Sequence, residues 1–299
     1  MNAELISEWQ MAGKLLGNEP MSRHTSWRVG GPADVYFSPA SIDDLAGFLR
    51  SLAGDEPVLW IGLGSNLLVR DGGFRGTVIA THRVLRKLER VGDHTVLAEA
   101  GVACAKLARH CARWGLGSAE FFAGIPGTVG GALAMNAGAF GGETWRHVVD
   151  VDVIDRSGEV RTRGFGEYRV GYRSVEGPAD EWFLAARLRF EADDQASPEA
   201  IRDLLARRKA AQPIGSLNCG SVFRNPPGRH AAELIESAGL KGHRIGDAVV
   251  SEKHANFIIN RGQATAAQIE ALIGHIIETV EREHGVRLET EVRIVGEPA

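Results

Sequence analysis

The segment 124–143 has the residue types most suggestive of chemistry, because seven of its twenty residues are glycine. Glycine loses more conformational entropy on folding than any other residue, so this density in an ordered region needs a reason. One reason is close approach of the backbone to an anion, since successive N–H groups in such turns form concave anion sites. A flexible linker is the alternative, but linkers are rich in serine and other polar residues. The segment instead carries Ile125, Val129, Leu133 and Met135, which favour a buried loop that binds a pyrophosphate.

A second glycine turn, 62–66, follows the apolar run 57–61, which predicts a buried strand. A G-x-G sequence after a strand is typical of dinucleotide-binding folds, but the third glycine is missing here. Leu67-Leu68-Val69 also predicts a strand where that fingerprint needs a helix. The chain has no GK[ST] sequence, which excludes a P-loop. The turn therefore offers Ser65 and Asn66 as hydrogen-bonding groups for a phosphate.

The composition is that of an ordinary globular chain of 299 residues, long enough for two or three domains. Its net charge of −4 argues against a general binder of nucleic acid or anionic membranes. The three cysteines form no C-x-x-C motif, which indicates a reducing compartment, and Cys104 and Cys111 predict core packing on one helix face. No metal site, signal peptide or membrane span is predicted, so we expect a cytoplasmic protein.

Helices and strands follow one another along the chain. Helical periodicity predicts helices over residues 1–20, 41–52, 102–114, 197–209, 231–238 and 266–284. Ser41, Ser197 and the pair Thr265 and Gln268 are expected to cap three of them. The apolar faces are expected to include Ile6, Trp9, Leu15 and Leu16 in the first helix and Ile201, Leu204 and Leu205 in the helix 197–209. Alternation of apolar and polar residues predicts strands over 148–155, 160–162, 181–190 and 286–294. The polar run 191–196 predicts a domain boundary.

Nine segments together resemble one family, the UDP-N-acetylenolpyruvoylglucosamine reductases, flavoenzymes that make UDP-N-acetylmuramate for peptidoglycan. Two of the matching pieces are the glycine segment Ala123-Gly124-Ile125-Pro126-Gly127-Thr128-Val129-Gly130-Gly131-Ala132 and the segment Gly62-Leu63-Gly64-Ser65-Asn66-Leu67-Leu68-Val69. The other matches lie at 24–34, 135–141, 171–173, 220–226, 238–242, 254–260 and 291–293. All nine occur in register, so the resemblance is specific.

The resemblance implies an α+β fold. A two-lobed FAD-binding domain of the vanillyl-alcohol-oxidase (PCMH) type would cover residues 23–192, with lobes over about 23–83 and 84–192 and with FAD between them. A smaller α+β substrate-binding domain would cover 193–299. The N-terminal helix predicted from the residue pattern would occupy residues 1–22, before the FAD-binding domain. The short spacing from Tyr172-Arg173 to the strand at 181–190 resembles the shorter subtype, which lacks an extra tyrosine-bearing substrate loop.

The resemblance also implies which residues bind ligands. Non-covalent FAD would be bound by Gly62, Gly64, Ser65, Asn66, Leu67, Gly124, Pro126, Gly127, Gly130, Gly131, Asn136 and Gly138. A branched side chain at Gly130 would then crowd the pyrophosphate. Clustered cations suit a diphosphate, so the candidates for binding the nucleotide sugar are Arg207, Arg208, Arg224 and Lys241, together with Tyr172 and Asn225. Any one of these cations could instead be a solvated surface charge. The family motif Tyr-Arg-x-Ser stands here as Tyr172-Arg173-Ser174-Val175, so the serine expected to support the arginine is displaced.

The implied reaction is NADPH-dependent reduction, through FAD, of UDP-N-acetyl-3-O-(1-carboxyvinyl)-glucosamine to UDP-N-acetylmuramate. Three catalytic residues are carried over by the resemblance. Arg173 would stabilise negative charge on the substrate carboxylate, and Ser221 would donate a proton. Glu291 would polarise or protonate the carboxylate region, which requires a neutral carboxyl and therefore a raised pKa.

Plainer interpretations exist for each of these residues. Ser221 could cap a turn, Arg173 could be a strand-face charge, and Glu291 could be one of four alternating surface charges. Two other functions also stay open: another FAD-dependent oxidoreductase of the vanillyl-alcohol-oxidase superfamily, and a nucleotide-sugar-binding module without catalysis. The expected partners are the nucleotide sugar and NADPH, with no nucleic acid and no membrane, and we expect a monomer.

Overall fold

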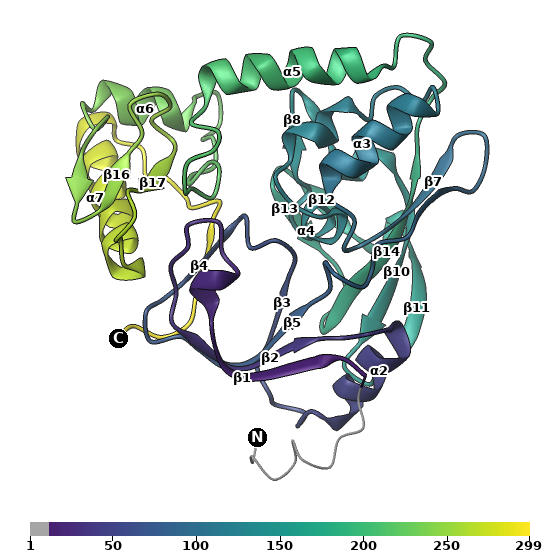
Figure 1. Cartoon of the computed structure of the whole chain (residues 1–299). Coiled ribbons are helices and arrows are strands. Elements are labelled where there is room, and N and C mark those ends of the chain that lie inside the picture. Colours follow the sequence, from purple (N-terminus) through teal and green to yellow (C-terminus); the bar gives the residue numbers. More distant parts are fainter. Residues whose placement is uncertain (1–11) are drawn as a thin grey trace.

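The computed structural model describes residues 12–299 as a large two-lobed part and a smaller C-terminal part (Figure 1). Helix α5, Pro198–Ala211, runs from one part to the other along the edge of the molecule. Its start is as predicted, because Ser197 Oγ accepts the Ala200 N–H at 3.2 Å and Pro198 occupies the first turn. Leu205 was expected to face inward with Ile201, but it is exposed.

The first lobe is built on a four-stranded sheet in the order β1-β2-β5-β3. Its strands are β1 (Lys14–Pro20), β2 (Pro32–Ser38), β3 (Val58–Ile61) and β5 (Phe74–Ala80). Helix α2, Ile42–Ser51, covers one face and is capped by Ser41, as predicted. The Phe37 and Phe48 rings, from the sheet and the helix, stack at 3.9 Å between centroids.

The predicted helix over residues 1–20 is wrong in the described part of that range. Lys14–Pro20 is strand β1, and it pairs antiparallel with β2. Gly17 and Pro20 are poor helix formers, and the ladder with β2 satisfies the backbone groups that a helix would otherwise pair. Ile6 and Trp9, which were assigned to the apolar face of that helix, lie outside the described residues.

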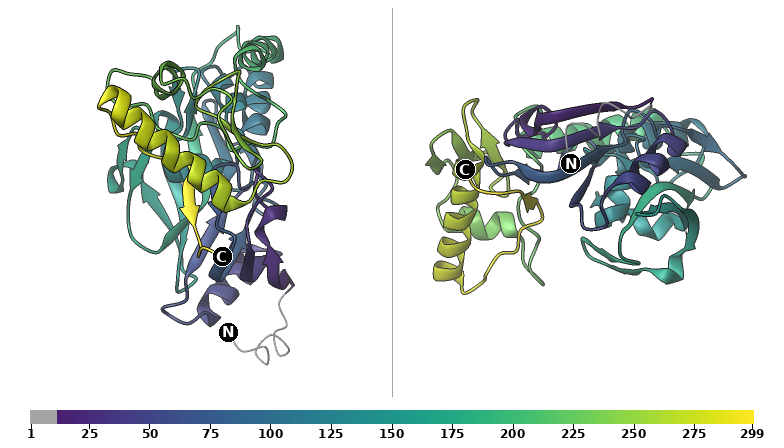
Figure 2. Two further views of the ribbon diagram at one scale, coloured as in Figure 1. Left: turned by 90° about the vertical axis from the view of Figure 1, so that its left-hand side faces the viewer. Right: turned by 90° about the horizontal axis from the view of Figure 1, so that it is seen from below.

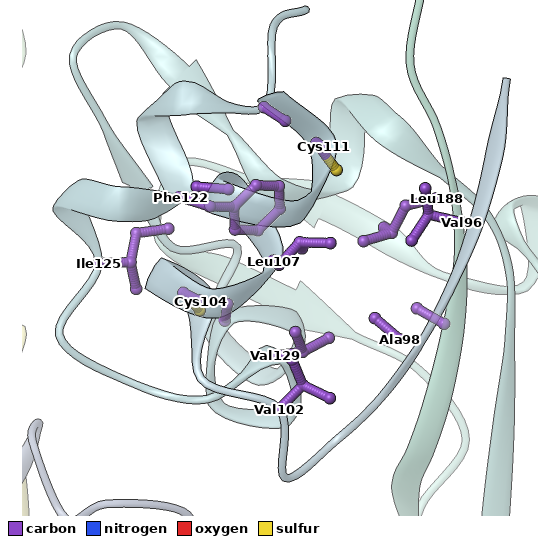
Figure 3. Packing of buried hydrophobic residues seen from close by; sticks show 14 of the residues in the cluster. Val96, Ala98, Val102, Cys104, Leu107, Cys111, Phe122, Ile125, Val129 and Leu188 are labelled. Atoms are coloured by element: carbon purple, nitrogen blue, oxygen red, sulfur yellow. The ribbon is translucent and has the colours of Figure 1, made fainter. Parts of the chain in front are cut away.

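The second lobe contains a five-stranded antiparallel sheet in the order β11-β10-β14-β7-β6. Its strands are β6 (Leu88–Arg90), β7 (Thr95–Glu99), β10 (Val148–Asp155), β11 (Val160–Gly164) and β14 (Glu181–Arg189). Helices α3 (Cys104–Arg113) and α4 (Val129–Met135) pack against this sheet. Figure 3 shows Leu107 and Cys111 of α3 facing Val96 and Leu188 of the sheet. Cys104 and Cys111 are buried in this core, as predicted.

The C-terminal part packs helices α6 (Ala231–Ser237) and α7 (Ala266–His284) against a small sheet of β15 (Arg244–Ile245), β16 (Ala248–Val250) and β17 (Ile258–Asn260). Helix α7 starts with the predicted capping box of Thr265 and Gln268. It ends at Gly285, which has the left-handed φ of 65° that favours glycine.

The end of the chain returns to the first lobe. The predicted strand over 286–294 is regular only at β18, Arg293–Val295, which pairs in parallel with β4, Leu67–Val69 (Figure 2). Leu288 and Val292 are buried in the C-terminal core. Residues 286–292 therefore pack against that core without forming a regular strand. This return places Glu291 two residues before β18, whose first residue, Arg293, donates its N–H to the Asn66 carbonyl of the glycine turn at 3.1 Å.

Candidate active site

Both glycine segments border one cavity of about 640 Å³. The first lobe contributes residues 59–67, and the second lobe contributes residues from 124 to 140 together with 173–175. The C-terminal part closes the cavity with residues that include 219–221, Arg224 and Glu291. Segments far apart in the sequence therefore meet here, and three parts of the fold surround one space.

Two glycines allow the loops of the two lobes to approach each other. A Cβ at Gly62 would lie 2.5 Å from Thr128 Oγ1, and a Cβ at Gly127 would lie 3.3 Å from Ser65 Oγ. Gly64 has φ +61°, and a Cβ there would lie 1.9 Å from the His24 carbonyl oxygen. A larger residue at these positions would force the lobes apart or twist the turn.

Six backbone N–H groups of these loops have no acceptor within the described residues. They belong to Leu63, Gly64, Ser65, Asn66, Gly127 and Thr128, all of which line the cavity. Buried backbone donors are nearly always paired, and these six donors, on residues that line the cavity, are open to a ligand with acceptor oxygens. Clustered backbone N–H groups suit an anion, and a pyrophosphate supplies several oxygens at once.

Arg173 lies in the turn between β12 (Arg169–Gly171) and β13 (Ser174–Glu176), with a left-handed φ of 53°. Its guanidinium makes three hydrogen bonds, to the carbonyl oxygens of Asn136 (3.3 Å) and Gly138 (3.0 Å) and to Glu291 Oε1 (3.2 Å). These contacts fix the charged group at the cavity wall without help from a serine. Ser174, in the place next to Arg173, lines the cavity itself.

Glu291 shares that wall, and its side chain is 14% exposed. Burial raises the pKa of the Glu291 carboxyl above its ordinary value, against the opposing effects of Arg173 and Arg224. The main chain of Glu291 is held on both sides, because its N–H donates to Val222 O at 2.8 Å and its carbonyl accepts from Asn66 Nδ2 at 3.0 Å. The carboxyl is therefore placed firmly beside the Arg173 guanidinium.

Ser221 and Arg224 come from the C-terminal part and line the same cavity. The Ser221 hydroxyl makes no hydrogen bond to any described residue, so it is free to bind a ligand. The Arg224 guanidinium donates from Nη2 to the Arg173 carbonyl at 3.2 Å, while its buried Nε has no acceptor in residues 12–299. A buried donor without a partner is costly, which indicates that a ligand oxygen belongs there.

Two family models match the chain. An FAD binding domain matches residues 33–164, and the UDP-N-acetylenolpyruvoylglucosamine reductase C-terminal domain matches residues 212–295. The UDP-N-acetylenolpyruvoylglucosamine reductase of Alkalilimnicola ehrlichii is 62% identical over 286 residues, which cover 95% of this chain and 96% of that protein. The chain belongs to the UDP-N-acetylenolpyruvoylglucosamine reductase family.

Other members of the UDP-N-acetylenolpyruvoylglucosamine reductase family support the same assignment. The protein of that name from Legionella pneumophila (strain Corby) is 56% identical over 300 residues, 99% of this chain and 96% of that protein. The crystal structure of the Thermus caldophilus reductase (MurB) superimposes with a TM-score of 0.80 at 32% identity, covering 95% of this chain and 99% of that one. The predicted family, the α+β fold with its FAD-binding part, and the class of FAD-dependent reductase are confirmed.

The residues of the cavity fit FAD, the cofactor that this family membership implies. Most of the predicted FAD residues line the cavity: Gly62, Gly64, Ser65, Asn66, Leu67, Gly124, Pro126, Gly127, Gly131 and Gly138. The loops that carry them supply the six open N–H donors. The structure does not bring Gly130 to this surface, because its N–H donates to Ala100 O at 2.8 Å and a Cβ there would lie 2.8 Å from the Ala100 Cβ. A branched residue at Gly130 would therefore crowd Ala100 and not a pyrophosphate.

Asn136, also predicted to bind FAD, has a supporting position behind the cavity. It is buried, ends α4 in the left-handed conformation, and donates from Nδ2 to Gly171 O at 3.0 Å. Its carbonyl accepts from Arg173. Asn136 thus anchors the turn that carries Arg173.

The predicted substrate-binding residues divide into two groups. Arg208 and Arg224 line the cavity. Tyr172, Arg207, Asn225 and Lys241 do not, although the Tyr172 ring lies 5.2 Å from the Arg173 guanidinium carbon. Arg207 is on the exposed face of α5, Asn225 accepts the Ala231 N–H at 3.1 Å, and Lys241 pairs with Glu236 at 2.6 Å. The sequence Arg207-Arg208-Lys209 does not indicate which of the three cations faces the cavity; in the structure it is Arg208.

Some lining residues were not predicted as site residues. Thr128, Gln212 and Phe257 border the cavity, and Phe257 also borders a second cavity of about 950 Å³ that shares Leu63, Ser65 and Arg208 with the first. Phe257 lies in the segment 254–260, one of the nine segments that match the family, and this match is the sequence feature that could have indicated a place in the site.

No group of histidine, cysteine or carboxylate side chains within residues 12–299 could hold a metal ion. None of the helices described is long and apolar enough to span a bilayer.

Proposed function

We propose that this chain catalyses the NADPH-dependent reduction of UDP-N-acetyl-3-O-(1-carboxyvinyl)-glucosamine to UDP-N-acetylmuramate. One observation carries the proposal: the Arg173 guanidinium, the Glu291 carboxyl and the Ser221 hydroxyl line the same cavity as the open N–H groups of the glycine loops. Beside a hydride donor, reduction of a vinyl carboxylate needs groups that stabilise the developing negative charge and supply a proton, and a cation, a buried acid and a free hydroxyl can perform these tasks. Flavin absorbance followed during successive addition of NADPH and this substrate tests the proposal.

FAD bound to the glycine loops supplies hydride transfer from NADPH to the substrate. The chain's own residues perform the remaining tasks. The N–H groups of Leu63, Gly64, Ser65 and Asn66 would hold the pyrophosphate. Gly62 and Gly64 allow the turn that carries these groups to pack closely against Thr128 and His24. We infer that the cofactor is not covalently attached. Of the described residues that line the cavity, Cys219 is the one cysteine and none is histidine, and burial raises the pKa of the Cys219 thiol to about 12.

Arg173 binds the substrate carboxylate and stabilises the charge that develops when a hydride adds to the vinyl carbon. An arginine suits this task because it is always charged and its planar fork matches a carboxylate. Three hydrogen bonds hold the group before the substrate arrives, so little reorganisation is needed as charge develops. Ser221 then supplies the proton to the carbon beside the ether oxygen.

Glu291 acts in its neutral form, which its raised pKa favours. The carboxyl is protonated below this pKa, so the substrate half-reaction should slow as pH rises through a value above the ordinary glutamate range. Glu291→Gln is neutral at every pH and should react more slowly but lose this decline. Single-turnover rates from pH 5 to 9, measured with both proteins, test the assignment. The same decline in Glu291→Gln would show that another group titrates.

Arg208 is the cation of its cluster that we assign to the nucleotide sugar. It lines both cavities, and burial lowers the pKa of its guanidinium. We expect Arg208→Gln to raise the substrate KM about tenfold, since a hydrogen bond to a charged group is worth roughly 1.5–3 kcal/mol. Arg207→Gln is the matched control, because this neighbouring side chain borders neither cavity. Equal changes in KM for the two variants would contradict the assignment.

The cellular role follows from the proposed reaction. UDP-N-acetylmuramate is a precursor of peptidoglycan, so the enzyme would serve cell-wall biogenesis and, through it, cell shape and cell division. We propose that it works in the cytoplasm as a monomer, with the nucleotide sugar and NADPH as its partners.

The domain limits at residues 23, 83 and 192 also stay a proposal. Strand β18, near the end of the chain, pairs with β4 of the first lobe and so belongs in space with that lobe.

A further inference from the structure

Ser221, the proposed proton donor, lies on a short irregular segment, 221–224, that belongs to no sheet strand and in which Phe223 forms an isolated bridge with Thr290. The next residues, Val222 and Phe223, are buried in the C-terminal core, which attaches the segment to that core. On one side the segment meets residues 289–292, where Arg224 N–H donates to Glu289 O at 2.9 Å and Glu291 N–H donates to Val222 O at 2.8 Å. Its other side needs partners for the backbone groups of Val222 and Phe223.

Asn256 supplies those partners. Its carbonyl oxygen accepts the Val222 N–H at 2.9 Å, its side-chain Oδ1 accepts the Phe223 N–H at 2.9 Å, and its Nδ2 donates to the Phe223 carbonyl at 2.8 Å. Asn256 is 4% exposed and does not line the cavity. One buried amide therefore replaces the ladder that a neighbouring strand would provide.

We propose that Asn256 is a positioning residue for catalysis: it fixes the segment that carries Ser221 and, through the Val222 carbonyl, the main chain of Glu291. The geometry assigns it no contact with ligand, so it acts through these two groups. Loss of the amide would leave the buried N–H and carbonyl of Phe223 unpaired and let the segment shift. A misplacement of about 1 Å at a reacting group can cost about 10²-fold in rate.

This inference depends on the proposed function, because it assumes a substrate half-reaction that needs Ser221 and Glu291. Asn256→Ala should slow flavin re-oxidation by the nucleotide sugar about 10- to 100-fold. Flavin reduction by NADPH should change less than about threefold, since that step needs neither residue. Asn256→Ser, which keeps a neutral hydrogen-bonding group, should give a re-oxidation rate between those of Asn256→Ala and the unmodified enzyme, and it serves if Asn256→Ala does not fold.

Asn260→Ala is the matched control. Asn260 is also 4% exposed and makes three side-chain hydrogen bonds, to Trp27 O, Gly262 N–H and Ala264 N–H, away from the Ser221 segment. Asn260→Ala should lower the thermal midpoint as much as Asn256→Ala does. It should not slow flavin re-oxidation by the nucleotide sugar more than it slows flavin reduction by NADPH. Hydrogen–deuterium exchange of a peptide covering residues 219–224 should speed up in Asn256→Ala and not in Asn260→Ala.

Two results would overturn the inference. Equal slowing of both half-reactions in Asn256→Ala, or unchanged exchange of the 219–224 peptide, would show that Asn256 has a general structural role. If the nucleotide sugar does not re-oxidise the reduced flavin of the unmodified enzyme, the proposed function itself is contradicted. Failure of the inference about Asn256 and failure of the proposed function are therefore distinguishable.

Discussion

Ser221→Ala is expected to slow flavin re-oxidation by the nucleotide sugar at least about 10²-fold while flavin reduction by NADPH stays nearly unchanged. The two half-reactions use the same flavin, but only the second needs a proton at the carbon beside the ether oxygen. The Ser221 hydroxyl lines the cavity and has no partner among the described residues, as a proton donor to substrate requires. Stopped-flow absorbance of the flavin measures each half separately.

Ser221→Cys provides the complementary variant, because a thiol is a stronger acid than a hydroxyl and should restore part of the rate. Partial recovery in Ser221→Cys together with loss in Ser221→Ala would support proton donation. If both half-reactions slow equally in Ser221→Ala, the residue positions the flavin or the fold, and the assignment as proton donor is wrong.

Arg173→Gln is expected to slow the substrate half-reaction about 10²- to 10³-fold, the range for removing one preorganised donor from a developing negative charge. The variant also removes the charge opposite Glu291, which lies 3.2 Å from Arg173 Nε. Arg173→Lys keeps the charge but cannot make the same three hydrogen bonds, so its rate should fall between those of Arg173→Gln and the unmodified enzyme.

Arg169→Gln is the control for this variant, because Arg169 lies on the same hairpin and its side chain is 85% exposed beside Glu176. Its substrate half-reaction should be unchanged, since exposed pairs contribute little. Comparable losses in Arg169→Gln and Arg173→Gln would mean that the hairpin fold, and not the Arg173 charge, sets the rate.

The sequence predicted the parts of the fold that depend on local signals. Ser41, Ser197 and Thr265 begin helices because their side chains accept N–H groups of the first turn, and this depends on a few neighbouring residues. The dinucleotide-fold interpretation of the turn 62–66 was rightly set aside, since Leu67–Val69 forms strand β4. The helix α4 inside the glycine segment was not predicted, although Thr128 caps it, because glycine-rich composition masked the pattern.

The predictions that were wrong concern features that depend on contacts between residues distant in the sequence. The helix assigned to residues 1–20 gave way to β1 because β2 offers a pairing edge, which no local pattern reports. The support of Arg173 could not be found from its neighbours, since it comes from Asn136, Gly138 and Glu291. Gly130 looked like a cofactor glycine, but its role is set by Ala100, thirty residues away.

The visible absorption spectrum of the purified protein, recorded anaerobically, tests the central claim most directly. We predict a yellow protein whose flavin stays in solution when the polypeptide is denatured and precipitated, as expected for non-covalent FAD. NADPH should bleach the flavin absorbance, and UDP-N-acetyl-3-O-(1-carboxyvinyl)-glucosamine should then restore it. A protein that stays colourless after incubation with FAD, or a bleached flavin that this substrate leaves bleached, would contradict the account.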